Sequence, residues 1–444
     1  MAGKRQKRRL EVVHPDCAGI DVGGHEHWVA VDPGRCEVSV RCFSGFTDDL
    51  QALADWLESL GITQVAMEAT GVYWIAPFEV LDARGFEVLL VNSRATRQVS
   101  GRKSDVLDCQ WIWQLMSHGL LSGAFRPGDA VCTLRAFVRQ RSRRIQAQSW
   151  CLNHMHKALA QMNVHLGHVV SDLKGKTAMR ILRAIVAGER DPWQLATLRD
   201  RRLRADEATV ARSLHGNWRV EHLFALEQAL AHFDFLEQQI GACDRAILSA
   251  LEALPVRACA PTELATPSRS AHRSAAEQRR LQQALVQAMG VDLSAIPSLG
   301  VDTVLVIAGE IGPDLSRFPS QAHFCSWLGL APPTRISGGK ALSGPGTKVN
   351  NIAAQALRQA ASNARSSRSF IGAAHRARLT RMDTAKAIKA TAHQLARLIY
   401  AMLTRGQPYV EKSIEAFETT RHDRQLRALQ RKARKLGLDL VPAA

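Results

Sequence analysis

Residues 17–32 read CAGIDVGGHEHWVAVD, the first apolar stretch after a basic and polar start. The pattern predicts a β-strand, a tight turn at the glycine pair and a second strand, with Asp21 in the middle of the first strand. A carboxylate within an apolar strand is unfavourable unless a partner compensates its charge. An aspartate at this position suits two chemistries: it can help to hold a nucleotide phosphate beside the glycines, or it can bind a catalytic metal ion.

The sequence around this stretch predicts a mixed α/β domain over residues 17–126. Three short β-rich runs come first and predict an antiparallel meander. A helix, a buried strand, a second helix, another buried strand and a long closing helix are expected after them. In chain order the segments are residues 18–23, 27–32, 37–43, 47–61, 64–70, 73–85, 87–92 and 104–121. This order is typical of an RNase H-like fold.

Four acidic residues of this domain would converge in that topology. Asp21 lies within one strand and Glu68 ends another, whereas Asp105 and Asp108 begin the closing helix on one of its faces. Asp at a helix start is common for capping and dipole reasons alone, but capping does not explain a carboxylate within an apolar strand. Converging carboxylates would repel one another unless divalent cations neutralise them, and oxygen-only ligands indicate Mg²⁺ or Mn²⁺. A nucleotide-phosphate site would need further glycine-rich loops, which the sequence lacks, so the pattern favours a metal site.

The remainder of the chain is predicted to be mainly helical. Residues 127–290 carry amphipathic helices long enough for a helical hairpin or a coiled coil, and they form the predicted dimerisation region. Residues 255–274 interrupt these helices and are expected to form an exposed loop. Residues 291–410 open with IPSLGVDTVLVIAGEIG, which resembles a helix-hairpin-helix that binds DNA phosphates through backbone amides. Residues 1–16 and 411–444 are a basic arm and a basic helical tail.

The charge balance favours a polyanionic partner. The 444-residue chain has 58 Lys and Arg against 41 Asp and Glu, a formal net charge of +17. No apolar run approaches a membrane span, and no apolar signal core follows the basic start, so we expect a cytoplasmic protein. Nine cysteines without a Cys-x-x-Cys pair argue against a structural zinc site or a disulfide framework. His14, His25 and His27 lack Cys or His partners at metal-binding spacing and are expected on the strand surface.

Several segments, in order along the chain, carry a family resemblance. GIDVG, AMEATGVYW and GRKSDVLDCQWI resemble the DEDD transposases of insertion-sequence family 110. IPSLGVDTVLVIAGEIG and the later RFPSQAHFCSWLGLAPPTRISGG resemble the C-terminal transposase domain of that family. The resemblance implies a RuvC-like N-terminal domain whose metal-binding catalytic residues are Asp21, Glu68, Asp105 and Asp108. It also implies a nucleophilic serine shortly after GLAP, which in this chain is Ser337.

Basic residues lie near both predicted sites. Arg335 and Lys340 could stabilise negative charge that develops beside Ser337. Ser343 in the same Gly/Ser/Pro-rich loop is the alternative nucleophile. The residues expected to contact nucleic acid are Arg94, Arg97, Arg102, Lys103, Arg335, Lys340 and Lys348.

The resemblance implies a DNA recombinase that moves its own insertion sequence in a bacterial cytoplasm, in association with the nucleoid. Ser337 would form a covalent phosphoserine link to DNA at a composite site shared with the Mg²⁺-binding carboxylates. A noncoding bridge RNA would pair with target and donor DNA, and dimers would assemble into tetramers. Two alternatives remain open. One is a metal nuclease of the Holliday-junction-resolving kind without a covalent intermediate, and the other is a catalytically silent nucleic-acid-binding protein.

Overall fold

The computed structural model describes most of the 444 residues. The described residues are 11–92, 105–258, 264–267, 270, 272–332, 335–337, 340–342, 351–411, 413–435 and 437–438. The chain divides into two compact units, residues 1–126 and 127–444, and each unit is described by itself. The boundaries expected after residues 16, 290 and 410 stay predictions.

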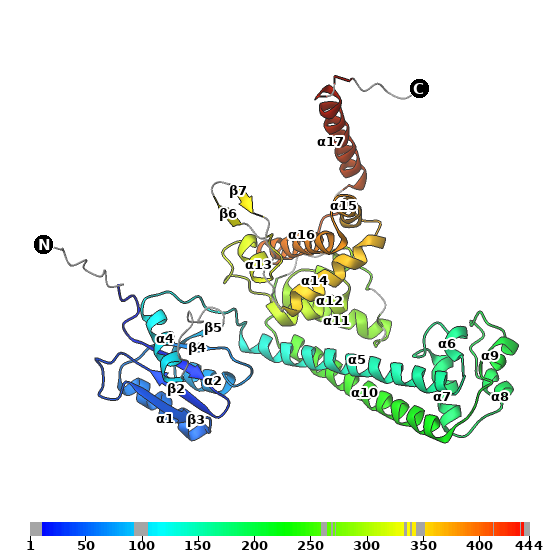
Figure 1. Ribbon diagram of the computed structural model, residues 1–444, viewed down its shortest axis with the longest axis horizontal. Coiled ribbons are helices and arrows are strands. Elements are labelled where there is room, and N and C mark those ends of the chain that lie inside the picture. Colours follow the sequence, from blue (N-terminus) through cyan, green and yellow to red (C-terminus); the bar gives the residue numbers. More distant parts are fainter. Residues whose placement is uncertain are drawn as a thin grey trace. The chain divides into compact units, whose positions relative to one another are not determined.

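A five-stranded sheet forms the centre of the first unit (Figure 1). Its strand order is β3-β2-β1-β4-β5; β1, β2 and β3 pair antiparallel, whereas β1, β4 and β5 pair parallel. The strands are β1 (Cys17–Val22), β2 (Glu26–Ala30), β3 (Val40–Ser44), β4 (Gln64–Glu68) and β5 (Glu87–Val91). The predicted meander and the two buried strands that follow it are therefore confirmed.

The helices of this unit cover opposite faces of the sheet. They are α1 (Thr47–Ser59), α2 (Ile75–Ala83) and α4 (Asp105–Ser117). Helices α1 and α2 pack on the face where Ile20 and Met67 are fully buried. Helix α4 packs on the other face, where Ile112 forms a small core with Cys17 and Ala66. Because side chains alternate along a strand, Asp21 and Glu68 belong to the face that α4 covers.

A glycine allows α4 to approach β1 closely. A Cβ atom on Gly19 would lie 2.6 Å from the carbonyl oxygen of Cys109, and still closer to the amide nitrogen of Trp113. Both neighbours are backbone atoms, which cannot move aside as the end of a flexible side chain could. The small size of Gly19 therefore sets the distance between this helix and the sheet.

Two 33-residue helices, α5 and α10, form the frame of the second unit and pack side by side (Figure 1). Four short helices lie at one end of the pair, around a core that contains the fully buried Met155 and Phe233. The helices up to this point are α5 (Asp129–Gln161), α6 (Leu166–Val169), α7 (Lys176–Val186), α8 (Pro192–Thr197), α9 (Glu207–Ser213) and α10 (Val220–Glu252).

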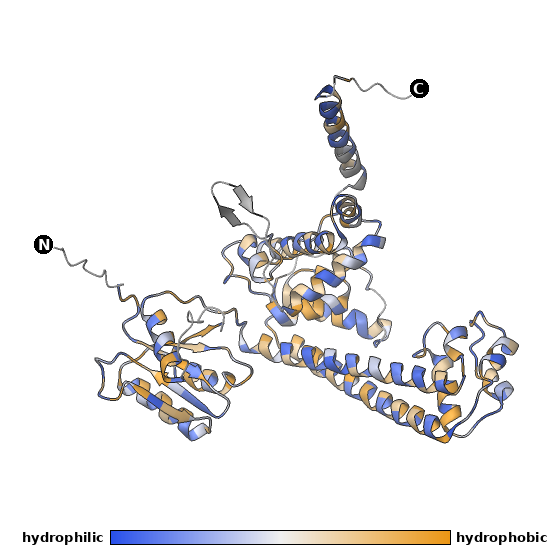
Figure 2. Cartoon of the chain, viewed as in Figure 1, coloured by the Kyte–Doolittle hydropathy of each residue, from blue (hydrophilic) through white to orange (hydrophobic). Residues whose placement is uncertain are grey.

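The rest of the second unit is mainly helical. Its elements are α11 (Ala275–Met289), η1 (Leu293–Ala295), α12 (Val301–Ile311), α13 (Gln321–Trp327), β6 (Arg335–Ser337), β7 (Lys340–Leu342), α14 (Ile352–Asn363), η2 (Ala364–Ser366), α15 (Phe370–Leu379), α16 (Thr384–Arg405) and α17 (Ile414–Lys435). Helix α12 is fixed to α5 by Glu310, whose buried carboxylate accepts two hydrogen bonds of 2.8 Å from Arg139. Helix α17 carries the basic tail, and its described residues are mostly hydrophilic and exposed (Figure 2).

The segment before α12 differs from the expected pair of helices. Only the three-residue 3-10 helix η1 precedes the turn, and α12 follows it. Pro297 and Ser298 interrupt the helical path, since Ser298 has a φ of +78°. The structure therefore does not confirm the helix-hairpin-helix expected for this segment.

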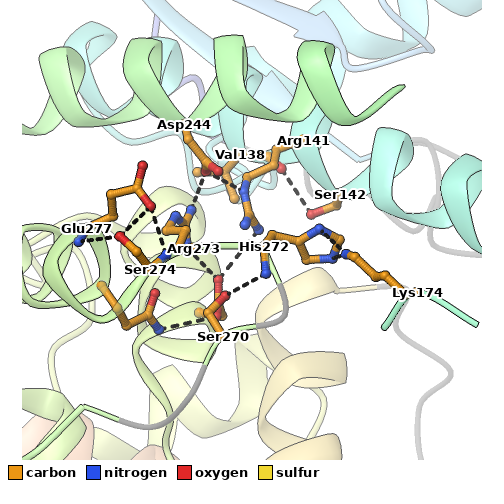
Figure 3. Close-up of polar contacts among 12 residues, drawn as sticks. Val138, Arg141, Ser142, Lys174, Asp244, Ser270, His272, Arg273, Ser274 and Glu277 are labelled. Carbon is orange, nitrogen blue, oxygen red and sulfur yellow. Dashed lines mark hydrogen bonds and ion pairs between the residues drawn. The ribbon is translucent and has the colours of Figure 1, made fainter. Parts of the chain in front are cut away.

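A buried charge cluster joins α5 and α10 to the segment before α11 (Figure 3). Asp244 accepts a 2.6 Å hydrogen bond from Arg141 and another from Arg273. The Arg273 side chain is only 4% exposed and also donates to Asp302 at 2.6 Å. The expectation of an exposed loop over residues 255–274 is therefore wrong at its C-terminal end, because Arg273 carries a charge that the helices neutralise.

Candidate carboxylate site and serine hairpin

The pairing of β1 with β4 brings the first two predicted carboxylates together. Ile20 is the parallel partner of Met67, so the next residues along the two strands, Asp21 and Glu68, occupy adjacent positions. Neighbouring strands lie about 4.8 Å apart, and both residues face α4. Glu68 accepts a 3.1 Å hydrogen bond from the hydroxyl of Thr70, the second residue after the strand.

The direction of α4 places its first turn over the same end of the sheet. Its later residue Ile112 packs with Cys17 at the start of β1, and Cys109 lies over Gly19. Helix α4 therefore runs antiparallel to β1, and the start of the helix lies at the end of the strand. The first turn, which contains Asp105 and Asp108, lies at the end where Asp21 and Glu68 are found.

The thiol of Cys109 lies at the contact between β1 and α4. Burial is the main reason that its pKa rises to about 12, and the negative charges of Asp21 and Asp108 raise it further. Both charges act on a thiol that α4 holds against β1.

Asp105 lies toward the antiparallel side of the sheet. The pKa of Cys42 in β3 is raised by burial, by a hydrogen bond and charge interaction with Glu26, and by the charge of Asp105. Cys42 and Asp21 are both pairing partners of Trp28 in β2. The acidic first turn of α4 therefore lies near the end of β1 and the neighbouring start of β2.

The accessibility of these groups suits an open site. Asp105 is exposed, whereas Asp21, Glu68 and Asp108 are half-buried. In the part of the chain that the structure describes, no three His, Cys, Asp or Glu side chains lie close enough together to hold a metal ion. The backbone thus brings all four predicted carboxylates to one end of the sheet, and their side chains remain spread over that end.

Two other titratable groups of the sheet are buried away from the carboxylates. Burial raises the pKa of Cys17 to about 12, so this thiol stays protonated at neutral pH. His27, which we expected on the strand surface, is only 3% exposed, and burial lowers its pKa. The expectation fails for His27 because the strand residue points to the face that α1 and α2 cover.

Ser337 lies at the end of a short strand where the sequence predicts a loop. Strands β6 and β7 pair antiparallel, with Ser337 opposite Lys340 and Arg335 opposite Leu342. Two glycines separate the strands in the sequence, a spacing typical of a tight hairpin. Register therefore sets a basic residue directly across from the predicted nucleophile.

The other predicted nucleic-acid contacts lie outside the described residues. They are Arg94, Arg97, Arg102, Lys103 and Lys348, together with the alternative nucleophile Ser343. Their roles stay predictions.

Two family models match the chain in two collinear segments. A model described as a transposase, of the DEDD type of IS110, matches residues 18–164. A second model, described as transposase IS116/IS110/IS902 family, matches residues 290–375. This chain belongs to the IS110 family of DEDD transposases. All four carboxylates of the transposase fall in the first segment and Ser337 falls in the second.

As an IS110-family member, the protein is an insertion-sequence transposase, an enzyme that acts on DNA. A search of curated proteins found no match to it. In the described part of the transposase, no helix has the length and apolar character needed to span a bilayer.

Proposed function

We propose that this transposase cuts and rejoins DNA through a RuvC-like carboxylate site and a covalent link between DNA and Ser337. The main support is the β1–β4 register, which sets Glu68 beside Asp21 on the face that the acidic start of α4 covers. Four carboxylates brought to one end of a sheet are a donor set that suits a divalent cation.

The donor set fits Mg²⁺ or Mn²⁺. Carboxylate oxygens are the ligands that these ions prefer, and Asp21, Glu68, Asp105 and Asp108 provide only such donors. Asp105 is exposed, so its side chain can turn toward an ion at small energetic cost. A bound cation would neutralise the mutual repulsion of these groups and polarise a DNA phosphate.

The covalent step proceeds by exchange of phosphate esters. The Ser337 hydroxyl oxygen forms a bond to phosphorus, the phosphorus–oxygen bond of the cut strand breaks, and the released strand oxygen takes up a proton. The serine proton passes to a base or to water. Attack by the hydroxyl of another strand then reverses the step and restores the free serine, so DNA is rejoined without net hydrolysis.

A guide RNA and an oligomer complete the proposal. The net charge of +17 supports a large polyanionic partner, and a noncoding bridge RNA would supply the sequence specificity by base pairing.

Exposed aromatic side chains lie on both long helices of the second unit. Phe224 and Phe235 are 61% and 53% exposed on α10, and Trp150 is 60% exposed on α5. These apolar side chains support dimerisation through a coiled coil formed by α5 and α10, and two such dimers would form the tetramer. If Phe224→Glu with Phe235→Glu left the dimer intact by light scattering, the choice of interface would be wrong.

A suicide DNA substrate tests the chemistry. Incubated with cognate RNA and Mg²⁺, the wild-type transposase should form a protein–DNA adduct that survives denaturation. Ser337→Ala should abolish the adduct, whereas Ser343→Ala, the matched control in the same segment, should retain it. Mass spectrometry of the adduct should locate DNA on the Ser337 peptide, and omission of RNA or chelation of Mg²⁺ should prevent its formation.

The same assay separates the alternatives. A nuclease that uses a metal-activated water would cut the substrate and leave no adduct. A silent nucleic-acid-binding protein would bind the substrate without cutting it. An adduct that survives Ser337→Ala and disappears in Ser343→Ala would transfer the nucleophile to the second serine.

A further inference from the structure

A groove with a volume of about 510 Å³ lies in the C-terminal part of the second unit, between α15 and α16. The two helices pack against each other (Figure 1). Helix α15 contributes Phe370, Ala374 and Arg378, which are spaced four residues apart and share one face. Helix α16 contributes a continuous stripe that runs from Ala390 to Arg405 at helical spacing. The groove therefore follows the helices and is not a gap at a single residue.

The charge of the groove has one sign. Arg378, Arg397 and Arg405 line it, and its described lining contains no Asp or Glu. None of these three arginines forms an ion pair with any other residue that the structure describes. Elsewhere in the unit, buried arginines are neutralised, as Arg141 is by Asp244. The cationic lining of the groove is thus uncompensated, which favours an anionic ligand.

Neutral groups hold Arg378 and Arg397 in position. Arg378 donates to the hydroxyl of Thr391 at 2.9 Å and to the side-chain oxygen of Gln394 at 2.6 Å. Arg397 donates to the side-chain oxygen of Gln321 at 3.0 Å. Burial lowers the pKa of Arg378, and the charge of Arg381 lowers it further. Hydrogen bonds to neutral oxygens orient a guanidinium without cancelling its charge.

The carboxylate of Glu411, beside the groove, is already engaged in local structure. Glu411 accepts a 2.7 Å hydrogen bond from the amide of Phe370 at the start of α15, and a 2.8 Å hydrogen bond from the hydroxyl of Tyr409. Both Phe370 and Tyr409 line the groove. Glu411 therefore orders the aromatic end of the groove and forms no ion pair with its arginines.

The apolar lining distinguishes a single strand from a duplex. Phe370, Leu398 and Val410 line the groove together with three alanines. A nucleic-acid duplex would present its phosphates but not its base faces, so the apolar lining of the groove would have no partner. A single strand offers phosphates to arginine and base faces to aromatic and aliphatic side chains. The basic tail of the chain is excluded as the occupant, since its last helical turn contains Lys432, Arg434 and Lys435.

We propose that the groove between α15 and α16 binds a single-stranded nucleic-acid segment, with phosphates at Arg378, Arg397 and Arg405 and bases against Phe370 and Tyr409. The inference rests on the proposed function in one respect, because it assumes that the strand is part of the DNA or guide RNA that the transposase handles. It adds a strand-holding site in which the predicted carboxylates and Ser337 take no part.

Photo-cross-linking of the full chain tests the position of the strand. The probes are 20-nucleotide single strands of mixed sequence, one of DNA and one of RNA, that carry 5-iodouracil. Peptide mapping should find adducts at Phe370 or Tyr409, and the arm with the stronger adduct identifies DNA or RNA as the ligand. A duplex of the same sequence should compete poorly.

Substitution of the exposed arginines tests the contacts. Arg397→Gln with Arg405→Gln should weaken binding of the preferred strand about tenfold at moderate salt, and should reduce the salt dependence of log Kd by about 0.7 per lost contact. Arg219→Gln with Arg280→Gln is the matched control, because these exposed arginines form ion pairs with Glu221 and Glu252. The control should bind within about twofold of wild type.

Each outcome decides the proposal. An unchanged salt dependence, cross-links confined to other peptides, or equal competition by duplex would overturn it. So would binding of polyglutamate that needs Arg397 and Arg405 without an oligonucleotide cross-link, since the groove would then belong to an acidic protein segment. If the groove cross-link forms but no DNA–Ser337 adduct is found, only the proposed function is contradicted. If the adduct forms but no cross-link maps to the groove, only the groove proposal is contradicted.

Discussion

Asp21 is the residue on which the proposed carboxylate site depends most. It lies mid-sheet on the face that α4 covers, and its charge raises the pKa of the Cys109 thiol.

Asp21→Asn should separate stability from activity. We expect adduct formation on the suicide substrate to fall by at least about a thousandfold, because a metal ligand is lost. The free energy of unfolding should change by no more than about 1 kcal/mol, since Asn keeps the shape of the side chain and Asp21 is only half-buried. Denaturant titration and the adduct assay on the same preparation measure both quantities.

Asp82→Asn is the matched control, because Asp82 is exposed on α2, on the opposite face of the sheet. It should leave both quantities near wild type. An Asp21→Asn variant that forms the adduct at the wild-type rate would remove Asp21 from the site.

At the scale of elements, the contact between β1 and α4 determines the geometry of the carboxylate site. The strand supplies Asp21, the helix supplies Asp105 and Asp108, and Gly19 allows the two backbones to approach. A helix displaced from the strand would carry its acidic turn away from Asp21. The packing of α4 on β1 therefore sets how close the carboxylates of the proposed site can lie.

Gly19→Ala should push α4 away from the sheet. The new Cβ would meet the backbone of Cys109 and Trp113, and overpacking of this kind costs about 1–3 kcal/mol. The midpoint of chemical unfolding should fall, and hydrogen exchange of α4 amides should become faster.

Gly24→Ala provides the comparison, since the nearest atom to its Cβ is a side-chain carbon of Tyr73 at 3.5 Å, an ordinary contact. Equal stability of the two variants would mean that the close helix–strand approach has no energetic role.

At the scale of the whole molecule, the second unit depends on charges brought together from distant parts of the sequence. Arg141 on α5, Asp244 on α10 and Arg273 before α11 form one buried cluster (Figure 3). His272 adjoins it and lies 2.8 Å from the ammonium of Lys174. Burial lowers the pKa of His272 from 6.5 to about 4, and the charges of Lys174 and Arg141 contribute.

Stability of this unit should therefore decrease in mild acid. Between about pH 6.5 and pH 4 the unfolded chain binds a proton at His272 that the folded chain does not, so the free energy of unfolding falls as the pH falls. The slope should stay below roughly 1.4 kcal/mol per pH unit, the limit for one proton, because the difference in bound protons between the unfolded and folded chains stays below one.

Denaturant unfolding at a series of pH values measures this slope. His272→Gln should make it shallower, whereas the exposed His232→Gln should not. An identical pH dependence in the wild type and His272→Gln would assign the acid sensitivity to other groups.

The amino-acid sequence by itself determined the α/β order of the first unit and the four carboxylates that reach one end of its sheet. Alternation along the strands and acidic residues at a helix start are local patterns, so residues 17–126 contain the signal. The strand assignments of Asp21 and Glu68 needed no knowledge of their neighbours. Their adjacency needed the β1–β4 register.

Only the tertiary structure decided which distant groups meet. The burial of Arg273, the inward direction of His27 and the arginine groove between α15 and α16 all depend on contacts across long sequence separations. A basic residue on an exposed face and one in a groove have the same local sequence pattern, so periodicity cannot distinguish them. The physical reason is that burial and charge compensation are properties of packed neighbours, which the order of residues along the chain does not show.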